Sequence, residues 1–210
     1  MKVTEDIHRI DGMGFVNVYA VIDAQGVTLV DTGLPGRSKA ILGYLSGLGL
    51  EPADVRTIVL THGDNDHIGS VAALQAATGA KIAIHEADAP ALTGAPYERA
   101  TGISRALFAL LRPFLRTQRA EPDILLRDGD TVAGLRVRHM PGHTAGSIVL
   151  TRPDGVVFSG DALLGDAKGD AEQPRKMLAY DYGDAVASAG AIEAMGYTLL
   201  LPGHGEPVRR

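Results

Sequence analysis

Four side chains of the kinds that bind metal ions lie within six consecutive positions of this sequence. They are His62, Asp64, Asp66 and His67, in the run Thr-His-Gly-Asp-Asn-Asp-His. Imidazole nitrogen and carboxylate oxygen are ligands that suit zinc, iron and manganese. A divalent metal ion with an open coordination position activates water for hydrolysis. The segment therefore predicts a metal site with hydrolytic chemistry.

Three further side chains of the same two types occur singly later in the chain, each directly after a glycine. They are His143, Asp161 and His204. Glycine allows sharp turns and a close approach of the backbone. Seven nitrogen and oxygen ligands exceed the four of a single tetrahedral site, so we expect a binuclear site. The chain contains no cysteine, which excludes thiolate ligands and disulfides.

Each ligand group follows a short apolar run that is typical of a β-strand. These runs are residues 57–60, 137–140, 156–158 and 198–201. In layered α/β proteins, sites form beyond the strand ends, because loops converge there while the sheet holds them in place. We therefore expect four strand ends to meet at one site.

The order of elements predicts an α/β fold with two β-sheets packed face to face and helices outside. Further strands are expected at residues 16–22, 27–30, 81–84, 135–140 and 148–151, and amphipathic helices at residues 37–48, 70–77 and 184–195. With 210 residues and 45% hydrophobic composition, residues 1–210 are expected to form a single domain.

The pattern changes between about residues 86 and 127, where we expect a helical insertion. Residues 103–115 are apolar on more than one helical face, so a helix there must be covered. Three alternatives remain open: the helix packs on the domain as core, lies over the metal site as a lid, or forms a homodimer contact.

The ordered motifs resemble those of the metallo-β-lactamase superfamily, whose signature is T-H-x-H-x-D-H followed by single His, Asp and His ligands. The resemblance extends over residues 27–33, 61–67, 128–130, 141–147, 159–161 and 202–205. It implies an αββα sandwich of two packed mixed β-sheets with outer helices, and two divalent metal ions.

The resemblance also implies a role for each candidate site residue. One ion would be bound by His62, Asp64 and His143, the other by Asp66, His67 and His204, with Asp161 bridging both. Asp31 would orient a ligand from outside the coordination sphere, although an Asp at this position also fits an Asx turn after a strand.

Asp64 departs from the family pattern, which usually has a second histidine there. The diiron branch of the superfamily resembles this chain in carrying an acidic residue at that position. The added negative charge favours a harder metal, so iron or manganese is an alternative to zinc. Three alternatives follow: a tuned binuclear site, a site occupied only on the Asp66 side, or a loss of activity, and the last would make the chain a non-catalytic metal-binding module. Asp64 also fits a solvated turn or a helix cap.

The predicted activity is metal-dependent hydrolysis. A metal-bridging hydroxide would attack an ester, thioester, lactone or related bond of a small-molecule substrate, and Asp66 would steer or accept the proton of the nucleophile. A remote alternative is an aspartic protease, because Asp31-Thr32-Gly33 resembles the active-site run of that class. Such enzymes need two carboxylates that share a proton, and a second Asp-Thr-Gly is absent.

Composition and charge restrict the partners and the compartment. The 25 acidic and 20 basic residues and a pI near 5.8 argue against nucleic-acid binding. Residues 1–6 lack the apolar segment of a signal peptide, and the chain has no apolar run of membrane length. We therefore expect a cytoplasmic protein without membrane association. His8, His85 and His139 fit no ligand position and are expected to be structural.

Overall fold

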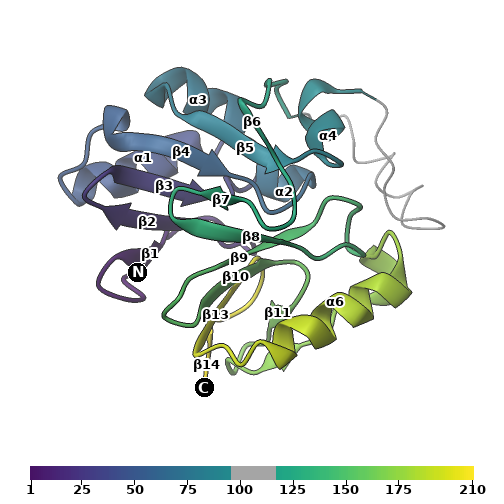
Figure 1. Ribbon diagram of the computed structural model, residues 1–210. Helices are drawn as coiled ribbons and strands as arrows, with labels where there is room; N and C mark the ends of the chain where they lie inside the picture. Colours follow the sequence, from purple (N-terminus) through teal and green to yellow (C-terminus); the bar gives the residue numbers. More distant parts are fainter. Residues whose placement is uncertain (96–116) are drawn as a thin grey trace.

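Short apolar segments, each ended by glycine, proline or a polar loop, form two six-stranded β-sheets that pack face to face (Figure 1). The structure is a computed structural model and describes residues 1–95 and 117–210. Helices cover the outer face of each sheet, which gives the αββα sandwich expected from the sequence.

The first sheet has the order β1-β2-β3-β4-β5-β6, the same as the order along the chain. Strands β1 to β3 pair antiparallel, whereas β3 to β6 pair parallel. The bounds are β1 (Ile7–Arg9), β2 (Tyr19–Asp23), β3 (Gly26–Val30), β4 (Val55–Val59), β5 (Lys81–His85) and β6 (Ile124–Leu126). The carboxyl ends of the parallel strands therefore lie at one edge of the sheet.

The second sheet has the order β14-β13-β10-β9-β8-β7. Its one parallel pair is β10 with β13, and the other neighbours are antiparallel. The bounds are β7 (Thr131–Val132), β8 (Leu135–His139), β9 (Ile148–Thr151), β10 (Val156–Gly160), β13 (Leu199–Pro202) and β14 (Val208–Arg209), with a small separate pair of β11 (Leu164–Gly165) and β12 (Ala171–Glu172).

Helices α1 (Ser38–Gly47) and α3 (Val71–Thr78) cover the first sheet, and α6 (Tyr182–Ala194) covers the second (Figure 1). The shorter helices are α2 (Asn65–Ile68), α4 (Ala89–Thr93) and the 3-10 turns η1 (Pro52–Asp54) and η2 (Lys176–Leu178). None of the helices in the described part of the chain combines the length and apolar composition needed to cross a membrane.

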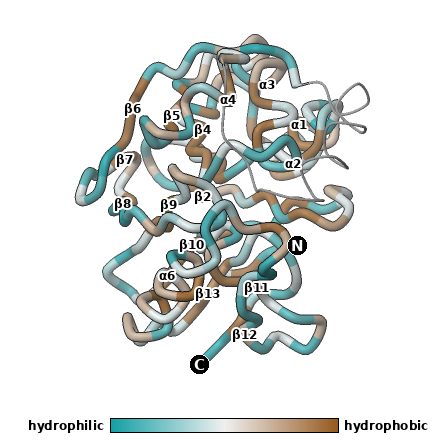
Figure 2. Tube along the Cα trace, turned by 90° about the vertical axis from the view of Figure 1, so that its right-hand side faces the viewer, coloured by the Kyte–Doolittle hydropathy of each residue, from teal (hydrophilic) through white to brown (hydrophobic). Residues whose placement is uncertain are grey.

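The core has three layers because alternate strand residues point to opposite faces. In β4, Val59 lies between the two sheets, whereas Ile58 packs on the helical side. The rings of Tyr19 and Phe158 meet edge to face across the sandwich, with centroids 5.6 Å apart. In Figure 2 hydrophobic residues recur along strands such as β4 and β13. Each fully buried aliphatic side chain contributes about 1.5–3 kcal/mol to folding, so this layer rigidly supports the strand ends.

The expected elements agree with the structure in type and differ at their ends. The strand expected at residues 16–22 begins only at Tyr19, because the preceding residues bond across the sandwich: the Asn17 amide donates to the Gly203 carbonyl at 2.7 Å. The short strands β1, β6, β7 and β14 were not predicted. The helix expected at 103–115 lies outside the described residues, while the flanking parts of 86–127 contain α4 and β6.

Candidate metal centre

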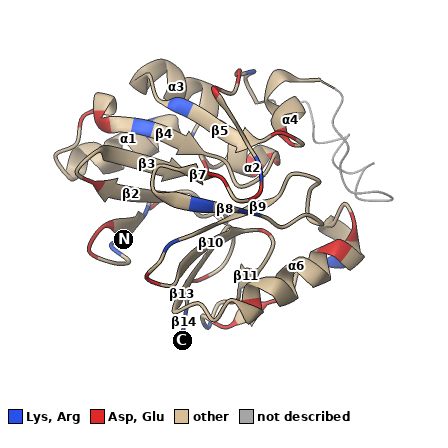
Figure 3. Ribbon diagram, in the orientation of Figure 1, with Lys and Arg blue, Asp and Glu red and all other residues tan. Residues whose placement is uncertain are grey.

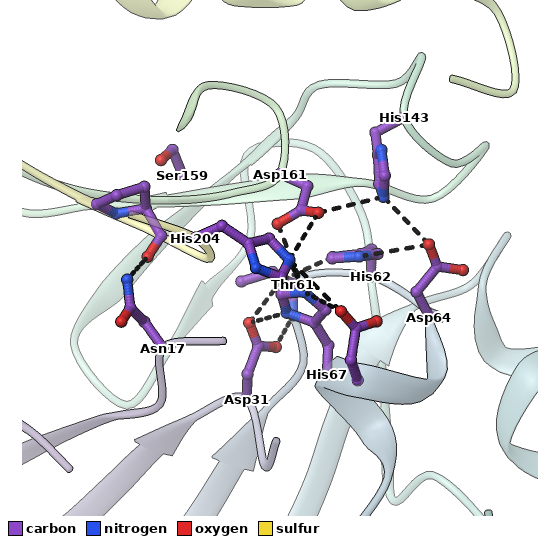
Figure 4. A network of polar contacts seen from close by, with 12 residues as sticks. Asn17, Asp31, Thr61, His62, Asp64, His67, His143, Ser159, Asp161 and His204 are labelled. Carbon is purple, nitrogen blue, oxygen red and sulfur yellow. Dashed lines mark hydrogen bonds and ion pairs between the residues drawn. The ribbon is translucent and has the colours of Figure 1, made fainter. Parts of the chain in front are cut away.

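The seven predicted ligands come together at one edge of the sandwich, where loops from both sheets meet (Figure 4). His62 follows β4, and α2 carries Asp66 and His67. The second sheet supplies the others: His143 from the loop between β8 and β9, Asp161 after β10 and His204 after β13. The expectation that four strand ends converge is therefore met in the fold.

One group of ligand atoms consists of His62, Asp64 and His143, whose ligand atoms all lie within 4.8 Å of one another. Asp64 Oδ2 is 3.1 Å from His143 Nε2 and 3.9 Å from His62 Nε2. Ligands about 2.1 Å from a tetrahedral ion are roughly 3.4 Å apart, so this spacing suits a shared metal ion.

The second group consists of Asp66, His67 and His204 and meets the same 4.8 Å limit. Asp66 Oδ2 is 3.4 Å from His204 Nε2 and 3.9 Å from His67 Nε2, and the two Nε2 atoms are 3.3 Å apart. A third group, His62, His67 and Asp161, overlaps the other two and meets the same limit.

Asp161 lies between the two groups. Its Oδ1 is 3.4 Å from His67 Nε2, and its Oδ2 is 3.5 Å from His143 Nε2 and 3.3 Å from His204 Nε2. This position is the one a bridging carboxylate needs. The close approach depends on Gly203, since a Cβ there would come within 2.4 Å of Asp161 Oδ1.

Hydrogen bonds at Nδ1 fix the orientation of three imidazoles. His67 Nδ1 is 2.9 Å from Asp31 Oδ2, and His204 Nδ1 is 2.8 Å from the Phe15 carbonyl oxygen. Both acceptors lack hydrogen, so each Nδ1 carries a proton, and in the neutral ring each Nε2 would be free to bind a metal ion.

The Thr61 side chain fixes the ring orientation of His62 in the same way. The Thr61 hydroxyl donates to Asp31 Oδ2 at 2.8 Å and lies 3.0 Å from His62 Nδ1. Because the hydroxyl proton is already used, His62 Nδ1 donates to Thr61 and His62 Nε2 is left as an acceptor. Asp31 thus orients two imidazoles, directly and through Thr61.

Two buried atoms lack a hydrogen-bond partner among the described residues: His62 Nε2 and Asp161 Oδ1. Leaving a buried polar atom without a partner costs about 1–3 kcal/mol. Both atoms are good metal ligands and face the centre (Figure 4). The residues therefore fit the pair of divalent ions that the ligand set implies.

The electrostatics of the centre favour bound cations. Burial lowers the pKa of His67 and His204, but the surrounding carboxylates, with Asp161 first, outweigh burial and raise these pKa values to about 9 and about 11. Asp161 itself is buried, yet the nearby imidazoles hold its pKa well below the ordinary value. Without metal, protons occupy positions that metal ions would take.

The pKa values of His62, His143 and Asp66 shift in different directions, because their neighbours differ. Burial, followed by the charges of His67 and His143, lowers the pKa of His62 to about 4. Burial also opposes charge on His143, but its hydrogen bond to Asp64 raises its pKa. Asp66 has a lowered pKa, because the neighbouring His67 charge overcomes the effect of burial. Carboxylates and at least one neutral imidazole are therefore ready to ligate at neutral pH.

Asp64 is the residue that departs from the family signature. It begins α2, but its side chain makes no capping hydrogen bond. Its carboxylate instead faces His143 and is only 23% exposed. This geometry disfavours the helix-cap and solvated-turn interpretations and supports a role as a ligand.

The histidines expected to be structural lie outside the three candidate groups found in the described residues. His85 and His139 stack on each other with ring centroids 4.1 Å apart, and His8 contacts the Tyr44 hydroxyl at 3.1 Å.

One buried carboxylate at this edge was missed by the sequence analysis. Asp88 follows β5 and bonds to loops that carry ligands. Asp88 lies three residues after the end of β5, so it did not stand directly beyond a strand end as Asp161 does.

Comparisons with known proteins agree with this geometry. The family profile described as the metallo-beta-lactamase superfamily matches residues 11–204. The chain is 30% identical over 204 residues to the uncharacterized protein YobT of Bacillus subtilis, covering 92% of this chain and 84% of YobT.

Two further similarities bear on the chemistry. The chain is 34% identical over 167 residues to the human acyl-coenzyme A thioesterase MBLAC2, covering 70% of this chain but only 58% of MBLAC2. Among solved structures, TTHA1623 in a di-iron-bound form has a TM-score of 0.73 and 26% identity, covering 96% of this chain and 93% of that one.

Proposed function

The chain belongs to the metallo-β-lactamase superfamily and is a metal-dependent hydrolase, and we propose that it cleaves the ester or thioester bond of a small molecule. The observation that carries the proposal is the convergence of six candidate nitrogen and oxygen ligands in two groups of three around Asp161. When bound there, two divalent ions would supply Lewis acidity and lower the pKa of water toward neutrality.

The side chains have distinct tasks in this proposal. His62, Asp64 and His143 would hold one ion, Asp66, His67 and His204 would hold the other, and Asp161 lies where it could serve both. Asp66 is also a candidate proton acceptor, because it is ionised at neutral pH and its side chain is 25% exposed, which leaves it within reach of solvent. Asp31 and the Phe15 carbonyl keep Nε2 of the imidazoles directed at the ions.

The substrate class follows from similarity and charge. MBLAC2 is an acyl-coenzyme A thioesterase, which supports a thioester as the first substrate to test. Acidic residues outnumber basic ones by 25 to 20, and both kinds are spread over the described elements (Figure 3), which supports a small molecule rather than nucleic acid as substrate.

A second candidate concerns the metal rather than the fold. Zinc suits the histidine-rich centre, but the charge of Asp64 and the similarity to a di-iron-bound structure support iron or manganese. In that case the centre is of the diiron type. Elemental analysis of protein purified without added metal distinguishes the two.

The test is a hydrolysis panel on the metal-loaded protein: an acyl-coenzyme A, an aryl ester and a lactone, each with zinc, manganese or iron. Thioester cleavage is measured with a thiol reagent, and because the chain has no cysteine, the reagent detects product thiol only. We expect Asp161→Asn to lose roughly 100-fold or more in rate, beyond the effect of changing an outer residue.

His8→Asn is the matched control, since His8 lies outside the centre, and it should retain the wild-type rate. The proposal is wrong if the loaded wild-type protein hydrolyses none of the three compounds, or if Asp161→Asn keeps full activity.

A further inference from the structure

Asp88 is a carboxylate with no exposed surface that joins two loops of the metal centre. Its Oδ2 accepts hydrogen bonds from the Gly63 amide and the Thr144 hydroxyl, each at 2.7 Å, and its Oδ1 accepts one from the Gly146 amide at 2.7 Å. Three hydrogen-bond donors from two loops therefore converge on one buried carboxylate.

The partners of Asp88 sit next to the ligands of one metal group. Gly63 lies between His62 and Asp64 in the chain, and Thr144 directly follows His143. The first loop comes from the first sheet and the second loop from the second sheet, so the carboxylate ties together the two segments that supply the His62, Asp64 and His143 group.

The other metal group has different supports. The carboxylate of Asp31 fixes His67, and the Phe15 carbonyl fixes His204. The three Asp88 carboxylate hydrogen bonds given above all involve the loops of the first group. Asp31 also reaches His62 through Thr61, so Asp31 supports both groups, whereas the Asp88 contacts given above concern the first group.

The surroundings are shaped to admit Asp88. A Cβ at Gly146 would lie 2.6 Å from both Cγ and Oδ1 of Asp88, so a larger residue there would displace the carboxylate. Ser147 completes the network: its Oγ is 2.7 Å from the Thr144 hydroxyl and accepts from the Thr144 amide at 3.0 Å. Since the Thr144 hydroxyl donates to Asp88, the Ser147 hydroxyl donates to Thr144.

We propose that Asp88 is a positioning residue for the His62, Asp64 and His143 metal group, and that it acts on that group selectively. The inference rests on the metal centre of the proposed function. In Asp88→Asn, one carboxylate oxygen becomes an NH2 group, which donates hydrogen bonds and cannot accept them. This NH2 group would face either the Gly146 N–H or the Gly63 N–H and the Thr144 hydroxyl, which are donors themselves. The two loops would then separate, and the ligands of this group would lose their spacing.

The experiment measures metal binding by the full chain, by titrating zinc against a chelator of known affinity. Wild type should bind two ions. Asp88→Asn should lower the affinity for one ion by about 10–100-fold and leave the affinity for the other unchanged. This is the range found for residues that orient metal ligands. Asp31→Asn is the comparison variant, and it should weaken the binding of both ions, because Asp31 supports His67 directly and His62 through Thr61.

Two backgrounds identify which ion is weakened. In His204→Ala, where the ion of the first group remains, Asp88→Asn should still weaken binding. In His143→Ala, where the other ion remains, Asp88→Asn should have no effect. Equal weakening in both backgrounds would mean a general structural role and would overturn the inference.

Thr144→Val gives a second variant if Asp88→Asn does not fold, because it removes one donor to Asp88 at nearly constant volume. It should weaken the same ion, and unchanged binding of both ions would also overturn the inference. A wild-type protein that binds no metal would instead refute the proposed function, together with the inference built on it.

Discussion

Replacing Asp31 tests how far the metal centre depends on a residue that binds no metal. Its carboxylate accepts from the Thr61 amide and the Thr61 hydroxyl, each at 2.8 Å, and from His67 Nδ1 at 2.9 Å. The residue also has a φ of 63°, a left-handed conformation that asparagine and glycine tolerate better than alanine.

The loss in the free energy of unfolding can be worked out from these contacts. In Asp31→Ala the Thr61 amide and His67 Nδ1–H lose their acceptor in a buried site, at about 1–3 kcal/mol each. The left-handed backbone adds about 1 kcal/mol for a residue with a Cβ. The expected loss is therefore about 5 kcal/mol, which for a chain of this size lowers Tm by roughly 15 °C.

Two further variants separate the contributions. Asp31→Asn keeps the backbone conformation and one acceptor oxygen, so we expect about half the loss of Asp31→Ala. Asp31→Gly lacks the same hydrogen bonds but adopts the positive φ, so it should be up to about 1 kcal/mol more stable than Asp31→Ala. Ala133→Gly is the matched control, since Ala133 has a φ of 48° and is exposed.

The assay is thermal unfolding of the metal-free protein, followed by circular dichroism in the presence of a chelator. The expected order of Tm is wild type, Asp31→Asn, Asp31→Gly, Asp31→Ala. A loss below about 2 °C in Asp31→Ala would show that the three hydrogen bonds do not stabilise the fold, and the reasoning would fail.

Three other predictions concern the ligands and the pH dependence. His67→Ala should lower the metal content from two ions to one and abolish hydrolysis without unfolding the protein, which elemental analysis and circular dichroism check; full metal content would contradict the assignment. Asp64→His should shift the metal preference toward zinc and move the acid limb of the rate profile to lower pH, because one negative charge is removed beside the bound water. Asp64→Asn is its control, and unchanged behaviour in both would exclude Asp64 as a ligand. Burial, followed by the neighbouring His139, lowers the pKa of His85, so the folded protein favours the neutral ring and its stability should fall as the pH drops below about 6.5, the pKa of an unfolded histidine. His85→Gln should flatten that fall in acid unfolding curves, and parallel curves would show that His85 does not contribute.

The ligand set was accessible from sequence because each ligand lies next to the strand end that positions it. His62 and His143 are placed by strands whose apolar pattern is local, and the structure brings them together as expected. The same local signal explains why the αββα architecture followed from the order of strands and helices.

Features that depend on distant partners were not accessible. Asn17 was assigned to a strand, but its amide bonds to Gly203, which is far away in the sequence. The contacts of Asp88 depend on two loops that lie side by side in the fold. The hydrophobic periodicity of the sequence does not predict which loops lie together. Strands of two or three residues, such as β7 and β14, are too short to show an alternating pattern.

Each of the two sheets is built from one continuous half of the strand order. In the described residues, the strands up to β6 build the first sheet and those from β7 onward build the second, apart from the small β11-β12 pair. The ligands divide at the same point, with His62 to His67 on one side and His143, Asp161 and His204 on the other.

Each candidate metal group draws side chains from both sides of that boundary, so a bound ion would cross-link the two halves of the molecule. The free energy of metal binding then opposes their separation, by about 4 kcal/mol when free metal is at 1,000 times its Kd. Two fragments cut between β6 and β7 should therefore reassociate far more tightly with metal than without it. Association of the two halves would then depend on metal.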